Sequence, residues 1–300
     1  MSGYAHPAYA WSLEEFGAPR ELPHCGGWVL ERPVAGTGER DATGCYPLFA
    51  CADWGRLGED LDAVAGDLLT IGLVADPFGN FERADFERCF DLVRPFKSHF
   101  VCDLALPADR FVSAHHRYYA RKALAGARVE VCADPRSFAD DWVRLYAELV
   151  ERHGLVGIKA FSRSSLERQL AVPGMAALRA VAGDEVVGGH LWYVQGDVVY
   201  SHLAAASQPG YALGVSYALY DFALRHFAER ARWLNLGAGA GLSARSDDGL
   251  ARFKRGWSSG TRIAYFCGRV FKRERYAEVV RMRGAETTDY FPAYRLGEFG

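Results

Sequence analysis

The sequence predicts a mixed α/β (α+β) protein in which two similar lobes, residues 1–126 and 127–300, share a cleft. Segments with strand character alternate with amphipathic helical segments along the whole chain. Between residues 176 and 205, three apolar segments are separated only by short turns that contain Gly and Asp, which is typical of an antiparallel meander. A similar coarse order of helices and strands recurs in both halves, and two α/β lobes are the most economical architecture for it.

The composition indicates a globular protein without a strong preference for polyanions. The chain has 300 residues, half of them hydrophobic, a net charge of −2 and a pI near 6.5. One region departs from this balance, since positions 251–283 hold ten basic residues (252, 254, 255, 262, 269, 272, 273, 275, 281 and 283) against two acids (274 and 278). This run predicts a local basic face, although solvated surfaces often look the same.

Cysteine spacing and the N-terminal sequence bear on the compartment. The seven cysteines are scattered and include no C-x-x-C pair, so we expect reduced thiols and neither a zinc site nor a disulfide framework. The N-terminus lacks the pattern of a secretion signal, and no apolar run approaches the length of a membrane span. We therefore expect a cytoplasmic protein that binds no metal and no membrane. Its oligomeric state is not predicted.

In the first half, large apolar and aromatic residues between turn formers predict strands at 28–34, 46–53, 69–74 and 98–105. Helical periodicity predicts helices at 57–69, 85–96 and 109–124. The last of these is basic, and Arg117 and Arg121 lie four residues apart on one face. Such a face is equally consistent with a solvated surface and with phosphate binding.

The second half alternates in the same way. Strands are predicted at 127–132, 176–182, 186–194, 198–205, 233–236 and 261–266, and helices at 138–151, 162–170, 211–230, 249–255 and 275–283. The tail at 290–295 is aromatic enough that we expect it to pack back on the body.

Two histidines of the meander, His190 and His202, are candidate site residues. If a three-residue loop at 195–197 joins its second and third strands, His190 lies opposite His202 and Trp192 lies opposite Tyr200, all on one face. Facing histidines beside two aromatic residues indicate a catalytic or substrate-contacting site. Structural histidines with satisfied hydrogen bonds are a common alternative.

A turn at 206–214 then leads into the long helix. A strand, a turn with glycine and a helix N-terminus favour phosphate binding, because free N–H groups and the helix dipole point at the ligand. The candidate donor-binding residues are Gln208, Gly210, Tyr211, Ala212 and Gly214. A plain strand-to-helix connection is the alternative.

The stretch 234–257 is the centre of the predicted cleft. Its strand, which contains Asn235, ends in three glycines at positions 237, 239 and 241, and a helix follows that Asp247 and Asp248 cap. This helix delivers Phe253 and Lys254 to its last turn. The glycine spacing is not G-x-G-x-x-G, so we do not expect a dinucleotide fold.

Between 138 and 271 the chain resembles the GNAT-type acyltransferases, and among them the FemAB-like branch of two tandem GNAT-like lobes. The resemblance rests on the meander, the turn and helix after it, the strand with glycines, and the segment GLARFKRGW, which is similar to a Gly-Leu-x-x-Phe-Lys element of that branch. The basic helix HHRYYARKAL is similar to the one that closes the first lobe there.

The resemblance implies two lobes, each with a mostly antiparallel mixed sheet flanked by helices, and an acyl-CoA donor. However, Gln208 and Gly210 are one residue too close together for the usual GNAT phosphate loop. An aminoacyl-tRNA donor, used in the FemAB-like branch, therefore remains an alternative. No charged heptad insertion of the coiled-coil arm is present, so the resemblance is to the arm-less form.

The implied reaction is transfer of an acyl group to the amine of a small molecule or peptide through a tetrahedral intermediate. It requires a base for the amine and a donor for the oxyanion. His190 or His202 is the candidate base, and Lys254 or the strand N–H groups at 186–192 are the candidate oxyanion donors. The similarity to the family element also implies Phe253 and Lys254 as active-site residues. Further candidate substrate-binding residues are Trp192, Tyr200, Arg117, Arg121 and Asn235. A non-catalytic module that binds a ligand in the same cleft is the alternative function.

Overall fold

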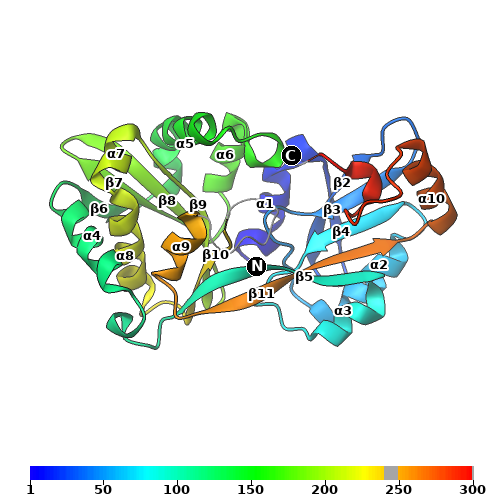
Figure 1. The fold of residues 1–300 in the computed structure, drawn as a ribbon, viewed down its shortest axis with the longest axis horizontal. Coiled ribbons are helices and arrows are strands. Elements are labelled where there is room, and N and C mark those ends of the chain that lie inside the picture. Colours follow the sequence, from blue (N-terminus) through cyan, green and yellow to red (C-terminus); the bar gives the residue numbers. More distant parts are fainter. Residues whose placement is uncertain (240–248, 299–300) are drawn as a thin grey trace.

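One continuous twisted sheet runs through the molecule (Figure 1). The structure, a computed structural model, describes residues 1–239 and 249–298. Its sheet has eleven strands in the order β1-β2-β3-β4-β11-β5-β10-β9-β8-β7-β6. The pairs β3–β4 and β9–β10 are parallel and the other neighbours are antiparallel. The predicted class, a mixed α/β (α+β) protein with a mostly antiparallel sheet flanked by helices, is confirmed.

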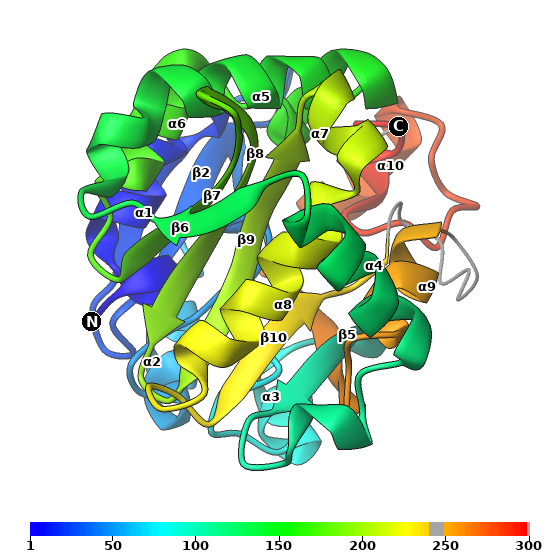
Figure 2. The same ribbon diagram turned by 90° about the vertical axis from the view of Figure 1, so that its left-hand side faces the viewer.

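The C-terminal half of the sheet contains β6 (Arg128–Val131), β7 (Met175–Ala182), β8 (Glu185–Gln195), β9 (Val198–Ala206) and β10 (Trp233–Gly237). Helices α5 (Ala139–His153) and α6 (Arg163–Leu170) cover one face of it, together with the short α1 (Pro7–Ser12). Helices α4 (Ala114–Leu124), α8 (Val215–Phe227) and α9 (Gly249–Arg255) cover the other face (Figure 2). A separate hydrophobic cluster fills each side.

The N-terminal half contains β1 (Ala18–Leu22), β2 (Gly27–Pro33), β3 (Arg40–Gly44), β4 (Thr70–Val74), β5 (Leu92–Asp103) and β11 (Gly260–Val270). Helices α2 (Leu57–Ala63) and α3 (Arg83–Cys89) pack on one face, and α10 (Arg273–Met282) lies at the far end (Figure 1). The tail packs back as predicted, since Tyr294 is buried and bonded to Thr70 and Asp41.

The twelve-residue strand β5 joins the halves, because its end nearest Asp103 pairs with β10 and nearly its whole length pairs with β11. The two predicted lobes therefore share one sheet instead of having two separate ones. The split at residues 126 and 127 stays a prediction. Three elements lie with the other half of the sheet from the lobe in which this split puts them. Helix α4 packs beside α8, and β11 with α10 lies in the N-terminal half.

Several predicted elements differ from the structure, and the helices predicted at 57–69 and 109–124 are shorter, as α2 and α4. Segment 46–53 forms no strand: Pro47 lacks the N–H that a ladder needs, and only Phe49 forms an isolated bridge, to Ala75. The helix predicted at 85–96 ends at Cys89, because residues from Leu92 onward join the sheet as β5. The strands β1 and β3 were not predicted.

The long helix predicted at 211–230 is in fact two helices. Helix α7 (Gln208–Leu213) ends at Gly214, whose φ of +71° is in the left-handed region, and α8 starts after it. In the part of the chain that the structure describes, no helix combines the length and the apolar character that crossing a bilayer needs.

Candidate active site

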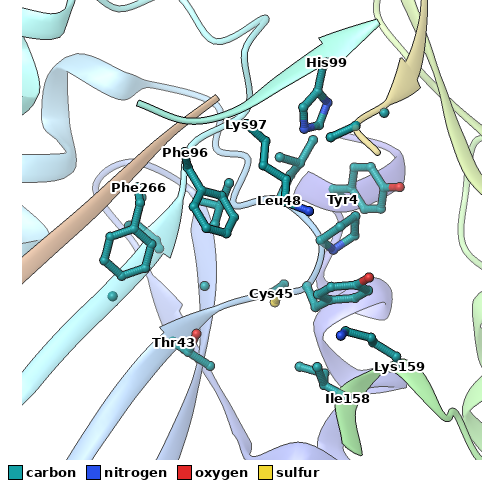
Figure 3. A pocket seen from close by; sticks show the side chains of 18 of the residues that line it. Tyr4, Thr43, Cys45, Leu48, Phe96, Lys97, His99, Ile158, Lys159 and Phe266 are labelled. Carbon is teal, nitrogen blue, oxygen red and sulfur yellow. The ribbon is translucent and has the colours of Figure 1, made fainter. Parts of the chain in front are cut away.

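A cavity of about 470 Å³ lies between the two halves of the sheet (Figure 3). Strands β3, β4, β5 and β11 and the loop after β3 line one side, and β9, β10, α9 and the segment before α6 line the other. The described polar and ionisable side chains on its wall are Tyr4, Arg32, Thr43, Cys45, Tyr46, Arg94, Lys97, His99, Lys159, Tyr200, Ser201, His202, Asn235, Lys254, Tyr290 and Arg295. Lys254, Asn235, Tyr200 and His202 were predicted as site residues.

Lys254 reaches the cavity from the last turn of α9. Its side chain is nearly buried, and Nζ donates a hydrogen bond of 2.7 Å to the carbonyl of Ala238, just beyond the end of β10. Gly237 makes room for it: a Cβ at this position would stand 3.2 Å from the Lys254 Nζ. The residue also has a φ of +75°, so a side chain here is disfavoured twice. The predicted caps Asp247 and Asp248, and Gly241, lie outside the described residues.

Helix α4 holds α9 in place. His116 donates from Nε2 to the carbonyl of Phe253 at 2.9 Å, and its Nδ1 is 2.7 Å from the Ser113 hydroxyl. Gly256 packs so tightly on the same ring that a Cβ there would lie 2.0 Å from the imidazole. The docking of α4 therefore fixes the turn that carries Lys254.

His99 on β5 faces Asn235 on β10 at the same end of the cavity. The Asn235 side-chain oxygen accepts the Gly237 N–H at 2.9 Å, so it also accepts from His99 Nδ1, at 3.1 Å. The hydrogen of the neutral imidazole is therefore on Nδ1, and Nε2 keeps its lone pair. Burial, aided by the charges of Lys254 and Lys97, lowers the pKa of His99 to about 4. The ring is thus neutral near pH 7.

The predicted pairing of His190 with His202 is wrong. The β8–β9 turn has two residues instead of three, and the register then shifts between Leu191 and Trp192. As a result, His190 pairs with Ala204, and Trp192 pairs with Ser201 instead of Tyr200. His190 packs on Trp192 against α8, at 4.1 Å between ring centroids, whereas His202 packs on Tyr193 on the opposite face at 4.7 Å.

Both of these histidines are held by burial and by hydrogen bonds within the protein, as structural histidines are. His190 is fully buried, is not among the residues that line the cavity, and has its Nε2 2.8 Å from the Ser201 hydroxyl. Burial holds its pKa well below the usual value. His202 lines the cavity, but its Nδ1 is 3.2 Å from the Tyr4 hydroxyl and its Nε2 is 2.8 Å from the Gln169 amide oxygen. Burial lowers the pKa of His202 to about 3.

Two further candidates, Trp192 and Tyr200, also differ in whether they line the cavity. Trp192 is fully buried in the hydrophobic core beneath α8 and does not line the cavity. Tyr200 does line it, and its hydroxyl donates a 2.7 Å hydrogen bond to Asp76. Asp76 is buried, which raises the pKa of this carboxyl to about 6 despite that hydrogen bond.

The remaining candidates near α4 lie away from the cavity. Phe253 packs on Tyr217 and Tyr220, with ring centroids 5.0 Å away in each case. Arg117 donates to the carbonyls of Asp109 and Val112 and so stabilises the turn before α4. Arg121 is exposed on the outer surface of that helix. None of the three is among the residues that line the cavity.

The predicted phosphate site at 208–214 forms the six-residue helix α7. Its N-terminal N–H groups already have protein acceptors: Gln208 donates to the Glu148 carboxylate at 3.1 Å, and Gly210 donates to the Ser207 hydroxyl at 3.3 Å. Gly210 also packs on β8, where a Cβ would lie 1.9 Å from the Val187 carbonyl oxygen. Because these N–H groups are engaged within the protein and Gly210 is packed against β8, the helix start does not offer free donors to the diphosphate of coenzyme A.

Sequence reasoning missed His99, Lys97 and the aromatic residues on the N-terminal side of the cavity. A strand was predicted at 98–105, but without a site. The one available signal was an ionisable pair, Lys97 and His99, which lie two residues apart and so on one face of a strand.

Comparisons with known proteins agree with this architecture. Residues 110–255 match the family model described as an acetyltransferase (GNAT) domain. A crystal structure of FemX is similar over 90% of this chain and 92% of its own, with a TM-score of 0.63 and 13% identity. The C-terminal domain of a proposed lysylphosphatidylglycerol synthetase from Agrobacterium fabrum is similar over 93% and 91% (TM-score 0.61, 14% identity).

A third structure, L-PGS from Bacillus licheniformis, is similar over 90% of this chain and 93% of its own, with a TM-score of 0.58 and 16% identity. A search of curated proteins gives no match. At these identities the structural similarities establish the fold alone. Residues 110–255 thus match a GNAT acetyltransferase domain model, and the fold of the whole chain is similar to that of FemX and of the other two solved structures.

Proposed function

We propose that the protein is an acyltransferase that forms an amide bond between a carboxyl group and an acceptor amine, with the chemistry at the His99 end of the cavity. The observation that carries this proposal is the convergence of His99, Asn235 and Lys254 around the end of β10. A neutral nitrogen base and a buried ammonium are two groups that acyl transfer requires.

In the proposed reaction, the amine nitrogen attacks the carbonyl carbon of the donor, and the carbonyl π bond opens to an oxyanion. Once the new N–C bond forms, the attacking nitrogen is positively charged and acidic, so even a weak base can take its proton. His99 Nε2 accepts that proton. The intermediate then collapses as the bond to the leaving oxygen or sulfur breaks, and the leaving atom takes up the proton held on His99 Nε2, which restores the neutral imidazole. Asn235 positions the imidazole through Nδ1 throughout.

Lys254 stabilises the oxyanion in this scheme, and Lys97 contributes to the same positive potential. Both ammonium groups lower the pKa of His99 in the absence of substrate. A negative oxygen beside them offsets their charges, so the basicity of His99 increases when the tetrahedral intermediate forms. The base is therefore strengthened at the step that uses it.

For the donor, we propose an aminoacyl ester such as an aminoacyl-tRNA. The coenzyme A site predicted at α7 is occupied by the Glu148 carboxylate, and the similar Agrobacterium protein is named for making lysylphosphatidylglycerol. The basic run from Arg252 to Arg283 offers a surface for RNA. Acyl-CoA remains the second candidate, because the matched family model is an acetyltransferase domain. Both donors occur in the cytoplasm, where we propose that the protein acts.

Donor binding separates these possibilities. Thermal melts with acetyl-CoA and filter binding with a mixed pool of charged tRNA test the two donors on the same preparation. We expect charged tRNA to bind with an affinity that falls steeply with salt, and acetyl-CoA to leave the melting temperature unchanged. Stabilisation by acetyl-CoA alone contradicts the aminoacyl proposal and favours the second donor. No response to either donor indicates the non-catalytic module.

A further inference from the structure

Three phenylalanines form an aromatic wall at the end of the cavity away from His99. Phe96 on β5 and Phe266 on β11 have ring centroids 6.0 Å apart, and Phe291 in the C-terminal tail lies 6.0 Å from Phe266. All three are half-buried, and none belongs to the four hydrophobic core clusters of the described residues. Their rings line the cavity instead of filling a core, and Figure 3 shows two of them, Phe96 and Phe266.

Glycines beneath this wall keep the aromatic rings in place. Gly72 and Gly268 are paired across β4 and β11. A Cβ at Gly268 would lie 2.7 Å from the Phe291 ring, and one at Gly72 would lie 3.3 Å from Phe266. Any larger residue at Gly268 therefore displaces Phe291. The sheet is shaped at this point to hold the rings against its surface.

The charge on the cavity wall has one sign. Six of the described lining residues are Lys or Arg, and none of the described lining residues is Asp or Glu. Arg32 and Arg295 are balanced by two carboxylates, since both pair with Asp41 and with Glu298. Arg94 is different: its guanidinium lies 5.5 Å from the centroid of Phe266 and donates to a backbone carbonyl, and no ion pair is recorded for it among residues 1–239 and 249–298.

Lys159 approaches the cavity from the opposite side, in the segment before α6 (Figure 3). No side-chain hydrogen bond or ion pair is recorded for this ammonium with any residue that the structure describes. Arg94 and Lys159 thus supply positive charge beside apolar surface, and no described carboxylate pairs with either. A ligand that carries a negative charge completes such a site.

We propose that the wall of Phe96, Phe266 and Phe291, with Arg94, binds an acceptor that carries a carboxylate or phosphate on an apolar body. This inference rests on the proposed function, in which His99 receives the amine of the same molecule. Five residues of β5 separate Arg94 from His99, which at about 3.3 Å per residue is roughly 16 Å. The acceptor therefore has its negative group about that distance from its amine.

Four probes with one aromatic body test the charge preference: 4-phenylbutyrate, 4-phenylbutyl phosphate, 4-phenylbutanol and 4-phenylbutylamine. Affinities are measured by ligand-detected NMR titration of the full chain. We expect the carboxylate or the phosphate to bind at least tenfold more tightly than the amine, with the alcohol between them. Whichever of the two anions binds more tightly identifies the negative group of the acceptor.

Three substitutions locate the binding. Arg94→Gln should weaken the anionic probes about tenfold and change the alcohol less than twofold. Phe266→Leu should weaken all four probes. Gly268→Ala should also weaken all four, because it displaces Phe291 without altering an aromatic residue. Arg88→Gln is the matched control, since this exposed arginine pairs with Asp85 on α3, away from the cavity. Circular dichroism confirms that each variant is folded.

Equal affinity for the four probes overturns the proposal, and so does tightest binding of the amine. Anion binding that Arg94→Gln leaves unchanged in a folded protein overturns it as well. Because the titration needs no donor and no turnover, its result is independent of the transfer reaction. A protein that binds the anions at this wall but transfers nothing contradicts the proposed function and leaves the subsite standing.

Discussion

The two sides of the cavity use their polar side chains differently. On the C-terminal side, both His202 nitrogens and the Tyr200 hydroxyl are engaged in hydrogen bonds within the protein. On the N-terminal side, His99 uses one nitrogen for Asn235, and no partner is recorded for its Nε2 among the described residues. Arg94 likewise has a carbonyl partner but no recorded carboxylate within that part of the chain.

This difference suggests a division of roles, in which the C-terminal side positions groups and the N-terminal side supplies the proposed base. The C-terminal side, which includes residues of the matched GNAT domain, holds His190 in the core and both nitrogens of His202 in hydrogen bonds, and it presents Asn235 and Lys254 at the cavity. The other side, outside residues 110–255, presents the proposed base and the proposed acceptor wall. A family match over one half therefore identifies the scaffold, whereas the proposed chemistry needs both.

The largest effect that we expect comes from removing the proposed base. His99→Gln should lower the transfer rate by about 10² to 10⁴, because the glutamine can still bond Asn235 but cannot accept the proton. In the unaltered protein the base works when neutral, and its pKa is lowered to about 4. The rate should therefore fall on acidification near pH 4, well below the ordinary histidine value of about 6.5.

A rate–pH profile of the transfer reaction measures this limb. His24→Gln is the control, since His24 is exposed beside Glu59 and should leave the rate unchanged. If His99→Gln transfers at the rate of the unaltered protein, the N-terminal side supplies no base and the comparison fails.

The next effect concerns the ammonium on the C-terminal side. Lys254→Met should reduce turnover by about 10² to 10³, the usual loss when one oxyanion donor is removed. It should also move the acid limb to higher pH, because the Lys254 charge helps to lower the pKa of His99. Lys122→Met, at an exposed position of α4, is the control. Normal turnover in a folded Lys254→Met variant assigns this lysine a purely structural role.

A pair of glycines tests whether the position of Lys254 matters separately from its charge. Gly237→Ala and Gly196→Ala both place a side chain at positive φ, +75° and +62°, which costs roughly 1–2 kcal/mol of stability in each case. Only at Gly237 does the new Cβ meet the Lys254 ammonium, whereas nothing lies within 4 Å at Gly196. We expect similar losses in urea denaturation, and a roughly tenfold lower rate for Gly237→Ala alone. Equal rates in the two variants indicate that the ammonium tolerates displacement.

The C-terminal half of the fold was largely predictable because its signals are local. The meander alternates with period two, its turns contain Gly and Asp, and β10 and α9 lie where the sequence indicates. In the N-terminal half, the five-residue strands β1 and β3 lack such alternation. The insertion of β11 between β4 and β5 joins segments that lie far apart in the chain, which periodicity does not reveal.

The candidate site was likewise predictable only where its signals are local in the sequence. Lys254 and Asn235 were found from a local motif, and both line the cavity. The histidine pairing failed because the two-residue turn and the register shift beyond it move the facing residues, and strand alternation in the sequence shows neither. His99 was missed because its importance depends on β5 pairing with β10, more than a hundred residues later.

The smallest expected effect comes from substituting His190, and it tests whether the histidines of the C-terminal side are structural. His190→Phe should keep turnover within about twofold and stability within about 1 kcal/mol, as measured by urea denaturation and the transfer rate. A phenyl ring can occupy the same slot between Trp192 and Tyr220, whose ring centroids lie 4.1 and 4.7 Å away. The lost hydrogen bond to Ser201 is offset by removal of the buried Nδ1, which has no recorded partner among the described residues. A large fall in rate without a fall in stability returns the base to His190, and with it the chemistry to the C-terminal half.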